Sequence, residues 1–121
     1  TIVSAKFTEK DPYGESWDGF GGAPEPKICA YAAVGETKST TIGCTTMKSD
    51  TFSPFYFETF EAEISSLEKL CFSAYDVDVS ADDYADGACW ENWVGLVKAG
   101  GYSGSLYDGF VQIDFTIAPK W

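Results

Sequence analysis

The apolar residues of this chain fall in short runs of β-branched and aromatic side chains, and no long stretch carries the periodicity of a helix. Phe110–Ile117 is the clearest run, because its apolar residues from Val111 onward alternate with polar ones, as in a strand with one buried face. Comparable runs predict strands at Ile2–Phe7, Lys27–Val34, Lys38–Thr45, Phe55–Ile64, Leu70–Tyr75 and Cys89–Val97. Seven or eight short strands separated by turn signals predict an all-β fold, a two-sheet antiparallel β-sandwich.

The segments between these runs are rich in glycine, proline and polar residues. Thr8–Pro26 predicts a long loop, and a loop of that length is uncommon unless it is functional. Ser49–Pro54 predicts a turn, Ser65–Lys69 a single helical turn and Gly100–Gly104 another loop. A chain of 121 residues is long enough for one domain with one core, so we expect residues 1–121 to form a single domain.

The charged residues exclude several classes of function. Histidine is absent, and all eight basic residues are lysines. Without histidine the chain has no Ser-His-Asp or Cys-His nucleophile and no histidine-ligated zinc. Without arginine it lacks the bidentate donor for phosphate or guanine, and a net charge of −11 repels nucleic acid. We therefore expect no nucleic-acid partner.

Four cysteines in a short acidic chain that begins at Thr1 predict a secreted, extracellular protein whose signal peptide has been removed. Free cysteines in a cytosolic chain are the alternative. Four cysteines allow three pairings. Cys29 and Cys44 are equidistant from the turn signal Gly35–Lys38, so a hairpin would place them opposite each other. Because Cys71 and Cys89 flank an acidic segment in the same way, we predict the disulfides Cys29–Cys44 and Cys71–Cys89.

That acidic segment, Tyr75–Gly87, carries five aspartates directly after an apolar run. Carboxylates crowded this closely repel one another unless a cation lies among them. Ca²⁺ fits such a segment, because it takes six to eight oxygen ligands from flexible loops. A solvated acidic loop is the alternative interpretation. A second pair of acids, Asp18 and Glu25, lies in the long first loop just before a strand and favours the cation.

Three segments carry a resemblance that covers nearly the whole chain. They are Trp17–Pro26 with its two acids, Ser53–Phe60 with the order Ser-Pro-Phe-Tyr-Phe-Glu-Thr-Phe, and Tyr75-Asp-Val-Asp followed by Asp82-Asp83. In order and spacing they resemble the C2 domain family, the calcium- and phospholipid-binding sandwiches of synaptotagmins, phospholipases and perforin. The resemblance implies an eight-stranded antiparallel sandwich. The closing strand resembles that of the permuted topology shared by the phospholipase and perforin-type domains.

The resemblance also implies which acids bind Ca²⁺. The metal ligands would be Asp18, Glu25, Asp76, Asp78 and Asp83 or Asp82. Glu25 is one methylene longer than the aspartate expected there, and Lys27-Ile28 follows it where Tyr-Val is common. The spacing from Asp18 to Glu25 is one residue longer than the family pattern, and the third loop contains one extra residue before Gly87. These departures bear on the calcium affinity and on the number of sites.

Aromatic and apolar residues accompany the acids in the same loops. Trp17, Phe20, Val79 and Tyr84 would lie beside the ions and could insert into a membrane interface once calcium masks the acids. The alternative is that some of them anchor the loops against the core. Trp90, Trp93 and Trp121 are expected in the core or at its rim.

The leading functional hypothesis is therefore a secreted C2-like module that binds Ca²⁺ and then a phospholipid membrane surface. Two alternatives stay open. One is an extracellular structural subunit of a filament or coat, with another protein or itself as partner and with structural calcium and disulfides. The other is calcium-dependent carbohydrate binding. An enzyme is not expected, because the acids are clustered for a metal and show no separate general acid and base.

Overall fold

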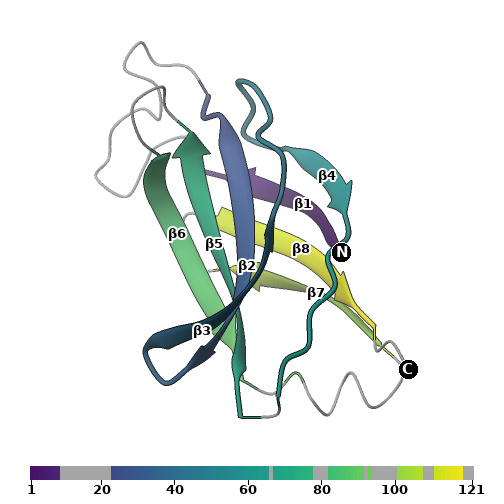
Figure 1. Cartoon of the computed structure of the whole chain (residues 1–121). Coiled ribbons are helices and arrows are strands. Elements are labelled where there is room, and N and C mark those ends of the chain that lie inside the picture. Colours follow the sequence, from purple (N-terminus) through teal and green to yellow (C-terminus); the bar gives the residue numbers. More distant parts are fainter. Residues whose placement is uncertain are drawn as a thin grey trace.

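The computed structural model describes residues 1–8, 23–65, 67–77, 82–91, 93, 101–107 and 111–118, with the backbone alone described at 82–86, 102, 106 and 107. Eight strands lie within these ranges and form two four-stranded sheets (Figure 1). The first sheet has the order β4 (Phe55–Glu58), β1 (Ile2–Phe7), β8 (Val111–Ile117) and β7 (Tyr102–Tyr107). The second has the order β3 (Thr37–Cys44), β2 (Pro26–Val34), β5 (Lys69–Val77) and β6 (Asp82–Trp90).

Every pair of neighbouring strands in these sheets is antiparallel. The predicted eight-stranded antiparallel sandwich is thus confirmed. The last strand, β8, lies between β1 and β7, so the first and last strands of the chain are neighbours in one sheet. This is the place of the closing strand in the permuted topology that the sequence predicted.

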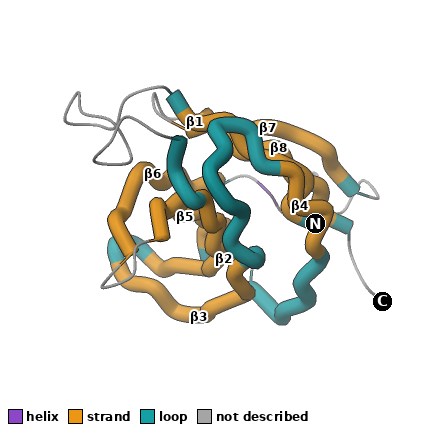
Figure 2. Tube along the Cα trace, turned by 90° about the horizontal axis from the view of Figure 1, so that it is seen from above, coloured by secondary structure: helices purple, strands orange, loops and turns teal. Residues whose placement is uncertain are grey.

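The two sheets face each other, as the view from above shows (Figure 2). The hydrophobic core lies between them. Alternation decides which side chains enter it: in β8, Val111, Ile113 and Phe115 are buried and the residues between them are not. The ring of Phe115 packs against Phe72 of β5 at 5.0 Å between centroids, which joins the two sheets. Burying a side chain of this size stabilises the fold by about 1.5–3 kcal/mol.

Three strand boundaries differ from the sequence predictions. The strand predicted at Phe55–Ile64 ends at Glu58, where the positive φ of Phe57 (53°) interrupts extended backbone. The strand predicted at Cys89–Val97 is instead Asp82–Trp90, and β7 occupies part of the loop predicted at Gly100–Gly104. At the predicted helical turn, the Glu68 amide donates to the Ser65 carbonyl (3.1 Å) and closes a turn. No helix in the described part of the chain is long and apolar enough to cross a membrane.

Both predicted disulfides are present, and each joins neighbouring strands. Cys29–Cys44 links β2 to β3, and Cys71–Cys89 links β5 to β6. In each case the two cysteines are direct partners in the strand register. The β2–β3 hairpin turns at Gly35, whose φ of +60° suits glycine. The symmetry of Cys29 and Cys44 about this turn therefore predicted their pairing correctly.

Candidate cation site at the acidic end of the sandwich

At one end of the second sheet, acidic positions of β5 and β6 lie next to the start of β2. Pro26 at the start of β2 pairs with Asp76 near the end of β5, and Asp76 pairs with Asp83 near the start of β6. The next pair outward joins Val77 to Asp82. Figure 1 shows the start of β2 beside the end of β5 at this end of the sandwich. We call this region, with Glu25 directly before β2, the acidic end.

Asp76 is the innermost acid of the acidic end. It occupies the same face of β5 as the core residues Phe72 and Ala74, and its side chain is only 2% exposed. Its Oδ1 accepts a hydrogen bond from the Glu25 amide (2.9 Å), and the Glu25 carbonyl accepts one from the Val77 amide (2.9 Å). A buried carboxylate is costly unless hydrogen bonds or a cation compensate its charge. Asp76 thus fixes the backbone of Glu25 at the edge of the core.

The strand register places the predicted ligands Asp82 and Asp83 next to Asp76. A register shift between Ala74 and Tyr75 marks a β-bulge just before this point. Bulges re-aim the chain and are common beside functional sites. The side chains of Asp82 and Asp83 lie outside the described atoms, and Asp18 and Asp78 lie outside the described residues. The described residues alone contain no group of three acids, cysteines or histidines arranged to hold a metal ion.

Asp50 is an acid at this end that the sequence analysis did not single out. Its Oδ1 accepts a hydrogen bond from the Ala23 amide (3.1 Å), and the Thr51 amide donates to the Pro24 carbonyl (3.0 Å). Asp50 has a positive φ of 49°, a conformation that aspartate tolerates better than most residues. An acid inside the predicted turn Ser49–Pro54 was the signal that could have identified it.

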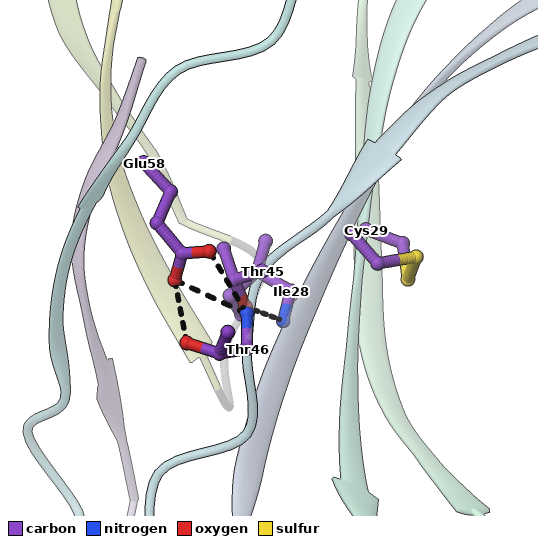
Figure 3. Close-up of a disulfide and its surroundings, with 6 residues drawn as sticks. Ile28, Cys29, Thr45, Thr46 and Glu58 are labelled. Atoms are coloured by element: carbon purple, nitrogen blue, oxygen red, sulfur yellow. Dashed lines mark hydrogen bonds between the residues drawn. A yellow bond between two sulfur atoms is a disulfide. The ribbon is translucent and has the colours of Figure 1, made fainter.

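The segment from Thr45 to Pro54, which carries Asp50, is fastened to both sheets. Thr45 is buried and exchanges two hydrogen bonds with Ile28: its Oγ1 accepts from the Ile28 amide (3.0 Å), and its amide donates to the Ile28 carbonyl (2.8 Å). Thr46 donates from its amide and its hydroxyl to the Glu58 carboxylate of β4 (3.1 and 2.8 Å; Figure 3). These hydrogen bonds therefore hold the start of the segment that carries Asp50 against β2 and β4.

Pro26 receives two further hydrogen bonds beneath the acidic end. The Lys48 amide and the Tyr56 hydroxyl both donate to the Pro26 carbonyl, at 3.2 and 2.7 Å. Burial raises the pKa of the Tyr56 phenol well above its ordinary value, so the hydroxyl stays protonated and able to donate. Tyr56 of β4 thus joins the first sheet to the start of β2.

Among known proteins, this chain is similar to solved structures. No protein-family model matches the chain, and no curated protein matches it. Over 95% of its length it superposes on human GIVD cytosolic phospholipase A2, in complex with an inhibitor and terbium chloride, with a TM-score of 0.71 and 18% identity. A structure described as a C2 domain is matched over 96% of this chain and 90% of its own length, with a TM-score of 0.66 and 14% identity.

The chain has a C2 fold.

A third similar structure contains two C2 domains of extended synaptotagmin 2 with calcium bound, and it matches with a TM-score of 0.59 and 13% identity over 95% of this chain. The C2 fold described here corresponds to 42% of that chain and to 16% of the phospholipase chain. Most of the phospholipase chain has no counterpart here, so its activity is a property of that larger protein.

The predicted membrane-contact residues of this C2 fold fall mostly outside the described part of the chain. Trp17, Phe20 and Val79 lie there, and Tyr84 is described by its backbone alone, in β6 opposite Tyr75. These four residues remain predictions from the sequence.

Proposed function

We propose that this C2-fold domain binds Ca²⁺ at its acidic end and that the calcium-bound form binds anionic phospholipid surfaces. One observation supports the proposal most directly: the register of β5 and β6 pairs Asp76 with Asp83 and Val77 with Asp82, and hydrogen bonds join Glu25 to Asp76 and Val77. The calcium bound to extended synaptotagmin 2, which has a similar fold, supports the same assignment. The two disulfides support secretion, since such bonds persist in oxidising compartments.

The donor set fits a hard dication. The acids of this end supply only oxygen ligands, and Ca²⁺ prefers carboxylate and carbonyl oxygens. Asp18 and Asp78 would complete the set from the two adjoining connections, and Asp50 adds a carboxylate beside Ala23. Bound calcium would offset the mutual repulsion of these acids, which is strong in a chain of net charge −11.

Calcium titration tests the metal half of the proposal. We expect saturable binding by isothermal titration calorimetry, and we expect Asp76→Asn to weaken it at least about tenfold, or about 1.4 kcal/mol. Asparagine keeps an oxygen that can accept the hydrogen bond from the Glu25 amide, so this variant removes the negative charge with little change of structure. Glu36→Gln is the matched control, because Glu36 is exposed in the turn at the far end of β2. Absence of binding heat in the parent protein would refute calcium binding.

Sedimentation with phosphatidylserine vesicles tests the membrane half. The net charge of −11 repels anionic lipid, so we expect binding only with calcium and none in excess EGTA. Replacing Trp17 and Phe20 by alanine should weaken vesicle binding and leave calcium binding unchanged. If calcium binds and the protein ignores vesicles, the membrane half is wrong. Sedimentation in calcium without vesicles would instead support the structural-subunit alternative.

A further inference from the structure

The end of the sandwich opposite the acidic end holds a pocket between the two sheets. Its volume is about 380 Å³, and its walls come from the first residues of β1 and β5, the last residues of β8 and the segment after β4. β5 begins at Lys69 and reaches the acidic end at Val77, so the wall residue Leu70 lies at the other end of the same strand. The volume falls within the range of small-molecule sites, about 300–1,000 Å³.

The interior of this pocket is apolar. Leu70, Phe72 and Phe115 form its buried floor, and Ile42, Phe60 and Ile64 are half-buried in its walls. Phe60 can lie flat against β3 because residue 43 is glycine, where a Cβ atom would overlap the Phe60 ring. A surface of this kind removes apolar ligand area from water, which favours binding.

Trp93 forms a wall whose orientation is fixed. Its indole Nε1–H donates to the Glu68 carbonyl (2.9 Å), and the side chain is 8% exposed. Glu68 is itself held, because its carboxylate accepts from the Ser39 hydroxyl (2.6 Å) and from the Ser65 amide (2.9 Å). The polar atom of the indole is thus satisfied by the protein, and the ring offers the pocket an apolar surface.

The rim of the pocket is acidic. Glu61 and Glu63 are both exposed there, and no lysine occurs among the described residues that line the pocket. A ligand with an anionic head would meet two carboxylates at the mouth, and the one positive group among the described lining residues is the Thr1 ammonium, which already donates to the Thr116 carbonyl (2.8 Å). A neutral head would meet no electrostatic repulsion at the rim, and a cationic head would be attracted by the two carboxylates.

We propose that this pocket binds the apolar body of a neutral or cationic amphiphile, with the head of the ligand at the Glu61–Glu63 rim. The site is separate from the acidic end and needs no calcium. An apolar body fills the space between the sheets beside Trp93, and the rim selects against anionic heads.

Two matched fluorescent probes test the proposal. N-phenyl-naphthylamine is neutral and apolar, and its sulfonated analogue, anilinonaphthalene sulfonate, carries the same rings with a negative charge. We expect the neutral probe to bind saturably in EGTA with one site, and the sulfonated probe to bind at least about tenfold more weakly. Equal affinity for the two probes would refute the selection by charge.

A substitution at the mouth locates the binding site. Ala62 lines the pocket and is exposed, so Ala62→Trp can block the entrance without burying a new side chain. We expect this variant to weaken the neutral probe at least about tenfold. The control is Val34→Trp, which adds an indole at an exposed position that does not line the pocket. If Ala62→Trp leaves the affinity within about twofold, the probe binds elsewhere and the proposal fails.

Removal of the rim charges tests the head-group selection separately. In Glu61→Gln with Glu63→Gln, the sulfonated probe should gain at least about threefold in affinity while the neutral probe changes little. Glu36→Gln, which removes one exposed charge from the β2–β3 turn, should change neither. An unchanged ratio of the two affinities in the double variant would contradict a role of the rim.

Discussion

Phe57 has a backbone conformation that its residue type disfavours. Its φ is 53°, in the left-handed region, where residues other than glycine, asparagine and aspartate are rare and bulky residues are outliers. Its ring is 66% exposed and stacks on Phe55, which is 64% exposed, at 5.9 Å between centroids. The left-handed backbone costs about 1–2 kcal/mol for such a residue, and the exposed ring gains too little from burial to offset that cost.

We predict that Phe57→Asn stabilises the domain. Asparagine adopts the left-handed conformation more readily, and little buried apolar area is lost, so the free energy of unfolding should rise by about 1 kcal/mol. Urea unfolding followed by tryptophan fluorescence measures the change. Phe55→Asn removes the same stacked pair without relieving a positive φ, and it should give no gain. Equal effects of the two variants would show that the φ of Phe57 is not the cause.

Single residues of the acidic end differ in how well the sequence predicted them. Glu25 and Asp76 stand beside strand boundaries, and in the structure the Glu25 amide donates a hydrogen bond to the Asp76 side chain. The burial of Asp76 was not predictable from an acidic run, because it depends on which face of β5 enters the core. Asp50 was missed because its neighbours Ala23 and Pro24 are distant in sequence and near only through the fold.

At the scale of elements, the sequence predicted the strands that contain apolar or β-branched runs, and it placed β6 and β7 incorrectly. β1 and β8 match their predicted ranges closely, since apolar residues alternate along both. β6 contains aspartate, alanine and glycine, residues of low strand propensity, and was interpreted mainly as an acidic loop. Its pairing with the buried strand β5, including Cys71–Cys89, outweighs that propensity. β7 was missed for the same reason, because serine and glycine interrupt its apolar residues.

Asp114 joins three strands of the first sheet. Its carboxylate accepts hydrogen bonds from Ser4 of β1 (3.1 Å), Ser105 of β7 and Gln112 of β8 (3.1 Å). Burial alone would raise the pKa of Asp114, but these hydrogen bonds and the nearby Lys6 together lower the pKa below its ordinary value of 3.8. The ionised form is therefore favoured by the folded state.

The lowered pKa predicts a pH-dependent contribution of Asp114 to stability. A carboxyl group with a lowered folded pKa stabilises fully above its unfolded pKa, and the effect disappears as the pH falls through the folded pKa. Asp114→Asn should therefore be less stable than the parent at neutral pH. The difference should shrink below pH 3.8 and vanish once the parent is protonated. Urea unfolding of both proteins along a pH series measures it, and a difference that persists in strong acid would contradict the assignment.

The disulfides predict a second effect at the element scale. They close segments of similar length, with sequence separations of 15 and 18. Loss of either bond should lower the free energy of unfolding by about 3 kcal/mol, chiefly by releasing the unfolded chain. The double variants Cys29→Ala/Cys44→Ala and Cys71→Ala/Cys89→Ala, compared by urea unfolding, test this. Cys71 is fully buried and Cys44 is exposed, so a larger loss for the second pair would reveal an additional packing effect.

At the scale of the molecule, the two ends of the sandwich carry different chemistry on one rigid pair of sheets. Acids gather at one end, and the apolar pocket opens at the other. We predict that saturating Ca²⁺ changes the affinity for N-phenyl-naphthylamine by less than about twofold, a coupling free energy below about 0.4 kcal/mol. Probe titrations with Ca²⁺ and with EGTA measure the coupling. A tenfold change would show that the strands transmit a rearrangement between the ends.

The pairing of β1 with β8 has a mechanical consequence. The two strands are antiparallel, and Thr1 and Thr116 exchange two hydrogen bonds of 2.8 Å at the outer end of the pair. A force that pulls residues 1 and 118 apart would open the β1–β8 hydrogen bonds one after another from that end, instead of shearing them together. The first sheet would therefore yield to tension before the second. Because two disulfides bridge the second sheet, the segments that they close could not extend, and the stretched molecule would stay shorter than its full chain length.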